Sequence, residues 1–210
     1  VQFVVDALWQ AMAAEGFHLN DRDVIGITES LVARAQGNYV TLAGVTADLN
    51  NKFGTDDLGV VFPLLSRNRF SPILKAIANG FSQVFLLLSY PADEVGNALM
   101  DLDRLEEAGI NPYTDLLTEE DYRRIFGSEV KHSFTGIDYV RFYKELGIND
   151  NIKIYFSNNP RDILGFTKKV LVANIHSRTR TKRAIRTAGA EVVYGLDDIC
   201  STPVEGNGYN

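Results

Sequence analysis

The 210-residue chain has few of the residues that hold small secreted or zinc-binding folds together. Its single cysteine, Cys200, excludes an intrachain disulfide, and we expect a reducing, cytoplasmic compartment. The three histidines (His18, His132 and His176) are scattered, and without a cysteine pair they do not predict a zinc site. The longest apolar run, Val84–Leu88, is far shorter than the ~18–20 residues of a membrane span. These absences leave an ordinary globular protein with a buried core.

Familiar catalytic signatures are also absent from the sequence. There is no Gly-x-x-x-x-Gly-Lys-Ser/Thr loop, which excludes a Walker-type NTPase. No Gly-x-Gly-x-x-Gly follows the first expected strand, so the standard dinucleotide-binding fingerprint is missing. No Gly-x-Ser-x-Gly elbow is present, and no general base can be assigned from the pattern.

Acidic residues outnumber basic ones, but the two signs are unevenly distributed. The formal net charge of −6 excludes bulk attraction to nucleic acid or to an anionic membrane. Residues 90–150 carry 14 acidic and 6 basic side chains, whereas residues 151–190 carry 9 basic and 1 acidic. Two explanations stay open: a small bound anion, or pairing of the two segments within or between subunits.

Apolar spacing alternates between helical and extended patterns, which predicts an α/β fold with a mixed or mostly parallel sheet and helices on both faces. We expect an N-terminal α/β part over 1–110, an acidic helical and loop insertion over 111–150, and a truncated C-terminal α/β part over 151–210. The expected helices cover about 3–15, 29–36, 44–53, 70–79, 99–108, 118–126, 138–146 and 177–188, and the expected strands 23–28, 58–62, 84–88, 152–156, 169–175 and 191–194.

In such sheets, ligands bind where strands end and helices begin, and four of these junctions are candidates. At the first, Thr28 and Ser30 can bind an anion at a helix start or simply cap that helix. At the second, Arg67 and Arg69 suit bidentate binding of phosphate or carboxylate, or pairing with the acidic segment.

Three carboxylates are candidate ligands of a divalent cation. Asp93 and Glu94 follow the most apolar strand, and hard cations use one or two carboxylates together with substrate phosphates. Asp138 lies in a glycine-containing polar loop before an expected helix. The alternative for all three is a structural role at a helix start.

The most basic junction gives the strongest indication of anion binding. The expected helix there starts with three hydroxyls and four cations, an arrangement that opposes the helix dipole. A phosphate held by backbone N–H groups and these side chains would compensate for that charge. The phosphate-binding candidates of this junction are Ser177, Arg178, Thr179, Arg180 and Lys182.

The first junction also carries a family resemblance. Asp-Val-Ile-Gly-Ile-Thr, from Asp23, leads into a helix in which Thr28, Val32, Ala35 and Gly37 match without gaps. This run of about sixteen residues resembles the N-terminal segment of coenzyme F-420 gamma-glutamyl ligases, with Ser30, Arg34 and Gln36 in place of the family's usual lysines and glutamate.

The resemblance implies a fold distinct from the standard Rossmann type and a homodimer. It further implies an amide ligase that uses GTP (or ATP) and Mg²⁺ or Mn²⁺ to convert a small-molecule carboxylate into an acyl phosphate, which an amino acid such as glutamate attacks. Two other interpretations stay open: a phosphate- or nucleotide-binding module without catalysis, and an interaction domain whose oppositely charged segments pair between subunits.

Overall fold

The computed structural model describes residues 2–204, which divide into two compact units. The first unit ends at Gly37 and the second begins at Asn38. The first contains two helices, α1 (Gln2–Glu15) and α2 (Glu29–Ala35), both at their expected places. The sequence-based boundaries at 110 and 150, in contrast, fall inside the second unit, whose strands from all three segments share one sheet.

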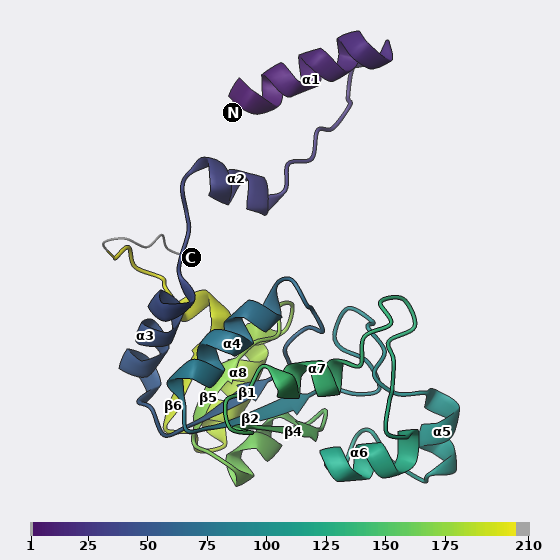
Figure 1. Cartoon of the computed structure of the whole chain (residues 1–210), viewed down its shortest axis with the longest axis vertical. Helices are drawn as coiled ribbons and strands as arrows, with labels where there is room; N and C mark the ends of the chain where they lie inside the picture. Colours follow the sequence, from purple (N-terminus) through teal and green to yellow (C-terminus); the bar gives the residue numbers. More distant parts are fainter. Residues whose placement is uncertain (1, 205–210) are drawn as a thin grey trace. The chain divides into compact units, whose positions relative to one another are not determined.

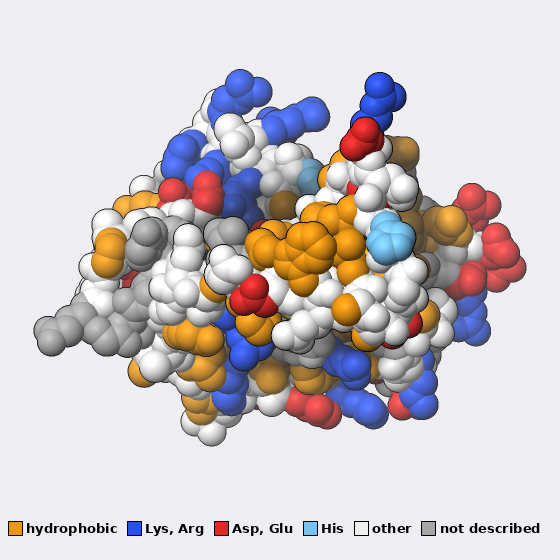
Figure 2. Space-filling model, turned by 90° about the horizontal axis from the view of Figure 1, so that it is seen from above, with side chains coloured by type: hydrophobic (Ala, Val, Ile, Leu, Met, Phe, Trp, Pro, Cys, Tyr) orange, Lys and Arg blue, Asp and Glu red, His pale blue; other side chains and the backbone are white. Residues whose placement is uncertain are grey.

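The expected strand over residues 23–28 is wrong. The segment is irregular, and Val24 is 92% exposed. In the described part of the first unit no neighbouring strand takes up its backbone hydrogen bonds, and an extended segment forms a strand only through such pairing. Two large apolar residues of α1 are also exposed, Trp9 by 62% and Phe3 by 72%. Figure 2 shows that exposed hydrophobic side chains (orange) gather in a patch of the surface.

The second unit is built on a six-stranded sheet in the order β3-β4-β2-β1-β5-β6 (Figure 1). All pairings are parallel except that of the short β3 with β4. The strands are β1 (Asp57–Val61), β2 (Gln83–Leu88), β3 (Leu117–Thr118), β4 (Ile152–Phe156), β5 (Lys169–Val172) and β6 (Val192–Gly195). The helices are α3 (Leu42–Phe53), α4 (Phe70–Gly80), α5 (Leu102–Glu107), α6 (Glu119–Phe126), α7 (Tyr139–Glu145), η1 (Pro160–Gly165), α8 (Arg178–Thr187) and η2 (Leu196–Asp198).

The strand order confirms the expected mostly parallel α/β sheet and adds a topological detail. Successive parallel strands extend from β1 to β2 and β4 on one side, and from β5 to β6 on the other. The chain therefore changes direction between β1 and β5, as doubly wound Rossmann-type sheets do at their ligand-binding crevice. The family resemblance implies a fold distinct from the standard Rossmann type. The structure differs from that type in the first β–α connection, because residues 62–69 contain none of the glycines of the dinucleotide-binding fingerprint.

Helices cover both faces of the sheet, and the strand residues alternate accordingly. Leu58, Val60 and Leu86 belong to a large cluster with α3 to α7. Val61, Leu87 and Val172 belong to a smaller cluster with η1 and α8. Figure 1 shows α3, α4 and α7 in the larger layer.

The smaller layer lies very close to the sheet at Gly59 of β1. A Cβ at this position would lie 2.5 Å from Cγ1 of Ile163 and 2.9 Å from Cγ2 of Thr167. Only glycine lets η1 approach β1 this closely, because any larger residue forces the packed layers apart. Because η1 lies between β4 and β5 in the chain, this contact holds the β4–β5 connection against the sheet.

Candidate functional site

The carboxyl edge of the parallel strands collects most of the side chains that the sequence singles out. Arg67 and Arg69 follow β1, Asp93 and Glu94 follow β2, and the basic start of α8 follows β5. Thr28 and Ser30 belong to the other compact unit, and Asp138 precedes α7. Nine of the twelve predicted site residues therefore share one edge of one sheet.

Asp93 organises the loop after β2. Its buried carboxylate accepts hydrogen bonds from the backbone N–H of Val95 at 3.0 Å and from the backbone and side chain of Asn97 at 2.9 and 2.7 Å. It also accepts from the backbone N–H of Leu65 in the loop after β1, at 2.9 Å. Asp93 thus joins two loops of the candidate site and has its acceptor positions already engaged by protein donors.

Glu94 reaches in the opposite direction, to the loop after β5. One carboxylate oxygen accepts from the backbone N–H of Ile175, and the other accepts from the backbone N–H of His176 at 3.1 Å. Because β1 lies between β2 and β5, this contact carries the loop after β2 across the end of β1. The acidic pair predicted as a metal site therefore holds three loops together in this structure.

Tyr143 of α7 positions the arginine-bearing loop after β1. Its buried hydroxyl accepts from the backbone N–H of Ser66 at 2.7 Å and donates to the carbonyl of Leu64 at 3.0 Å. Burial is the main reason why the pKa of Tyr143 is raised, so the hydroxyl stays protonated at neutral pH. Arg67 and Arg69 follow directly and are exposed.

The start of α8 presents backbone donors that have no acceptor within residues 2–204. The first hydrogen bond of the helix runs from the N–H of Thr181 to the carbonyl of Ser177, which leaves the N–H groups of Arg178, Thr179 and Arg180 without one. The hydroxyl of Ser177 does not cap them. Such a terminus carries partial positive charge and is suited to an anion.

Asn174 fixes the geometry of this helix start. Its side chain is buried, and its Nδ2 donates to the hydroxyls of Ser177 at 2.7 Å and Thr181 at 3.2 Å. Its Oδ1 is buried and lacks a hydrogen-bond partner in the described chain. A buried polar atom without a partner is costly and is typical of functional sites that gain a partner on binding.

Two cations of α8 pair with the turn after β6. Arg178 lies 3.1 Å from a carboxylate oxygen of Asp197 and also donates to the carbonyl of Asn174 at 2.8 Å. Lys182 lies 2.9 Å from Asp198 and 3.3 Å from Asp197. Partial burial acts to raise the pKa of Asp198, but the contacts with Lys182, the backbone N–H of Gly195 and the charge of Arg186 together outweigh it, and the pKa is lowered. Arg178 and Lys182 thus pair locally and not with residues 90–150, the alternative to a bound anion in the sequence analysis. Arg180 is exposed.

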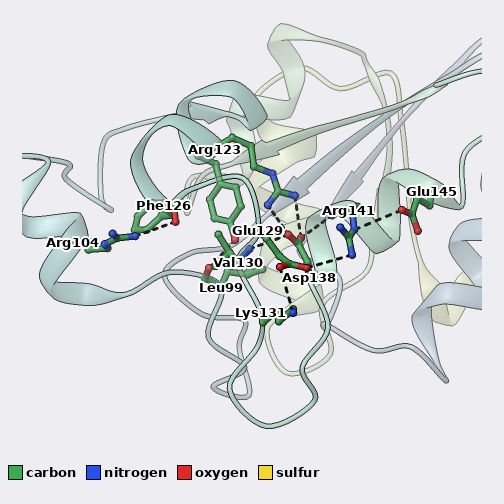
Figure 3. A network of polar contacts seen from close by, with 11 residues as sticks. Leu99, Arg104, Arg123, Phe126, Glu129, Val130, Lys131, Asp138, Arg141 and Glu145 are labelled. Carbon is green, nitrogen blue, oxygen red and sulfur yellow. Dashed lines mark hydrogen bonds and ion pairs between the residues drawn. The ribbon is translucent and has the colours of Figure 1, made fainter.

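Asp138, predicted as a metal ligand or as an N-cap, is the N-cap of α7 (Figure 3). Its carboxylate accepts from the backbone N–H of Arg141 at 2.9 Å and of Val130 at 3.0 Å. The guanidinium of Arg123 from α6 binds both oxygens, at 2.6 and 3.0 Å. Burial opposes ionisation, but these contacts hold the pKa of Asp138 below its usual value.

Thr28 is the N-cap of α2, with its hydroxyl accepting from the backbone N–H of Leu31 at 3.4 Å. Ser30 is an exposed residue in the first turn. This is the capping alternative of the sequence analysis, on a helix of only seven residues.

Three residues of the site were not singled out from the sequence: Asn174, Tyr143 and Asp198. The available signal for Asn174 is its place at the end of an apolar strand, two residues before His176. Nothing in the sequence pairs Tyr143 with a loop more than 70 residues away. Among residues 2–204, no group of three or more histidine, cysteine or acidic side chains could hold a metal ion. The helices of this part of the chain also include none with the length and hydrophobicity of a membrane span.

The fold and this edge define an α/β protein with a basic, uncapped helix start beside the switch point of its sheet. A family model described as F420-0:Gamma-glutamyl ligase matches residues 2–134. The chain therefore belongs to this family of amide ligases, whose substrates are small molecules. No curated protein and no solved structure matches the chain.

The family match and the sheet have different extents. Residues 2–134 include β1 to β3 and the loops that carry Arg67, Arg69, Asp93 and Glu94. β4, β5, α8 and β6 follow the matched segment. The basic helix start therefore lies outside the match, and its role rests on the geometry of this chain.

Proposed function

We propose that this protein is a nucleotide- and metal-dependent amide ligase of the gamma-glutamyl type. In the proposed reaction, a carboxylate oxygen attacks the γ-phosphorus of GTP or ATP, the bond from that phosphorus to the β-phosphate oxygen breaks, and the nucleoside diphosphate leaves. The amine of an amino acid such as glutamate then attacks the acyl carbon, phosphate leaves and the amine loses a proton. Membership of the family supports the amide-forming step.

The start of α8 carries the nucleotide part of the proposal. This helix start lies beside the switch point of the sheet. It has three backbone N–H groups without an acceptor among the described residues, together with the exposed Arg180 and the half-buried Arg178. Backbone donors and guanidinium groups stabilise the charge of a transferring phosphoryl group. Arg67 and Arg69, on the neighbouring loop after β1, are the proposed contacts to the substrate carboxylate or to a second phosphate.

The divalent cation is proposed to enter with the nucleotide. Asp93, Glu94 and Asp138 already accept hydrogen bonds from protein N–H groups and do not form a cage for a free ion. Mg²⁺ commonly binds through substrate phosphates with one or two protein carboxylates. We therefore expect no tight binding of Mn²⁺ alone.

Isothermal titration calorimetry tests this function. GTP and ATP are titrated into the full chain with and without Mn²⁺, and then into the Arg178→Ala/Arg180→Ala double variant. We expect nucleotide binding that depends on the metal and falls at least tenfold in the double variant, since two guanidinium contacts are lost. Arg124→Ala, which removes one exposed cation of α6, is the control and should bind normally. Failure of the wild-type chain to bind either nucleotide would refute the proposal.

A second candidate is a phosphate- or nucleotide-binding module without catalysis. The engagement of all three predicted metal carboxylates in structural hydrogen bonds favours it. This candidate predicts metal-independent binding and no release of phosphate from GTP when carboxylate and amine substrates are supplied. The homodimer also stays a proposal, which sedimentation at low and high salt would test because ion pairs between subunits weaken with salt.

A further inference from the structure

The carboxylate of Glu94 occupies a pair of backbone donors next to the candidate phosphate site. The N–H groups of Ile175 and His176 each bind one of its two oxygens. Four residues further along the chain, the N–H groups of Thr179 and Arg180 have no acceptor in the described chain. The segment from Ile175 to Arg180 thus offers a row of donors, and the part nearest the strand is filled by an internal anion.

The position of Glu94 is held by the loop rather than by burial of its side chain. Glu94 itself is exposed, whereas its neighbour Asp93 is buried. Asp93 accepts hydrogen bonds from Val95 and Asn97 within the same loop and from Leu65 in the loop after β1. A rigid base therefore carries an exposed carboxylate across the end of β1 to the loop after β5. An exposed side chain can leave its partners without a large rearrangement of the core.

The chemistry of the two donors makes them a site for an oxyanion. Two successive backbone N–H groups that bind both oxygens of one carboxylate can bind two oxygens of a phosphoryl group in the same way. Phosphate carries more charge than a carboxylate and therefore competes well for such donors. The unpartnered Oδ1 of buried Asn174, beside the same helix start, can accept from a protonated phosphate oxygen or a ligand hydroxyl.

We propose that the N–H groups of Ile175 and His176 are part of the nucleotide-phosphate site, and that Glu94 is an internal competitor which the phosphate must displace. This inference rests on the proposed function, because it assigns the ligand of the same site. We call the contact of Glu94 with these two N–H groups the latch. In the absence of ligand the latch keeps both donors hydrogen-bonded. Only molecules in which the latch is open can bind phosphate, so the apparent affinity is the intrinsic affinity multiplied by the open fraction.

Replacement of the carboxylate by an amide, Glu94→Gln, tests the competition. A neutral amide accepts more weakly and its NH₂ group cannot accept at all, so the latch opens. We expect inorganic phosphate, and GTP with Mg²⁺, to bind about tenfold more tightly to Glu94→Gln than to the wild type, which corresponds to a latch closed in about nine molecules of ten. Calorimetry measures both affinities.

Glu107→Gln is the matched control, since it makes the same chemical change at an exposed residue of α5. It should leave the affinity for phosphate unchanged, which separates the latch from the change in net charge. Amide hydrogen exchange gives a second measurement: the N–H groups of Ile175 and His176 should exchange faster in Glu94→Gln, and added phosphate should slow them again.

The outcomes separate the latch from the proposed function. Equal or weaker phosphate binding by Glu94→Gln, with a binding wild type, overturns the latch and leaves the nucleotide site in place. Unchanged exchange at Ile175 and His176 in the variant overturns it as well. If neither protein binds phosphate or GTP, the latch and the proposed function both fail.

Discussion

Removal of the Asp138 carboxylate decides between a structural role and a metal-binding role for this residue. In the Asp138→Ala variant, α7 loses its N-cap, which costs about 1 kcal/mol of stability. The same change leaves Arg123 without the partner that binds it through two hydrogen bonds. Breaking a fully buried pair costs about 3–5 kcal/mol, but the Arg123 side chain is 20% exposed and can regain water, so we assign about 2 kcal/mol to this loss.

The two losses together predict a decrease of about 3 kcal/mol in the free energy of unfolding. For a protein of this size, that corresponds to a decrease in Tm of roughly 6–12 °C. Urea unfolding followed by circular dichroism measures the change, and Asp103→Ala, which removes an exposed carboxylate in the first turn of α5, is the control. A double-mutant cycle with Arg123→Met isolates the pairwise coupling.

The reasoning is refuted if Asp138→Ala unfolds within about 0.5 kcal/mol of the wild type, the range of ordinary surface substitutions. It is also refuted if the variant keeps its stability and loses Mn²⁺-dependent nucleotide binding, which would make Asp138 a metal ligand. Normal nucleotide binding by the folded variant is the expected result.

Four further predictions concern pH, the loop after β1, the contact at β1, and the turn after β6. The folded-state pKa of Asp138 lies below its unfolded value of 3.8, so the wild type should be more stable than Asp138→Asn at neutral pH. In acid unfolding, this difference in stability should shrink as the pH falls below about 4. Tyr143→Phe leaves the N–H of Ser66 without its acceptor and should cost about 1–3 kcal/mol in urea unfolding, whereas Tyr113→Phe, at an exposed ring, should cost nothing measurable. Gly59→Ala should lower stability by about 1–3 kcal/mol through contact with Ile163, and Gly136→Ala, where a Cβ meets no atom within 4 Å, would show the cost of a left-handed glycine alone. Asp198→Ala leaves Lys182 paired with Asp197 alone and should strengthen phosphate binding in calorimetry, so weaker binding would contradict a role for this cation at the site.

Much of the fold could be predicted from the sequence, because burial of apolar residues imposes the local periods. Val84–Leu88 is covered on both faces and appears as an unbroken apolar run, and its strand is confirmed as β2. Helix stops at glycine, such as Gly54 after α3, are confirmed too. The strand expected over 23–28 failed because apolar composition does not show whether a partner strand exists. The two-residue β3 depends wholly on pairing with β4 and leaves no period to detect.

The candidate site was predictable only in part. The rule that ligands lie beyond the carboxyl ends of parallel strands predicted Arg67, Glu94 and Arg178 at one edge of the sheet, where the structure has them. It could not tell that Glu94 binds backbone N–H groups, because the donors lie more than 80 residues away in the sequence. Likewise, the choice between N-cap and metal ligand for Asp138 depends on Arg123, which only the folded chain brings to it.

Amide hydrogen exchange at the start of α8 tests the central claim most directly. The N–H groups of Arg178, Thr179 and Arg180 have no acceptor in the described chain, so they should exchange fast in the free protein. Saturating GTP with Mg²⁺ should slow exchange at these three positions, while the amides of the exposed loop at Gly136 stay unchanged. Nucleotide binding that leaves the exchange of Arg178 to Arg180 unaltered would contradict a phosphate site at this helix.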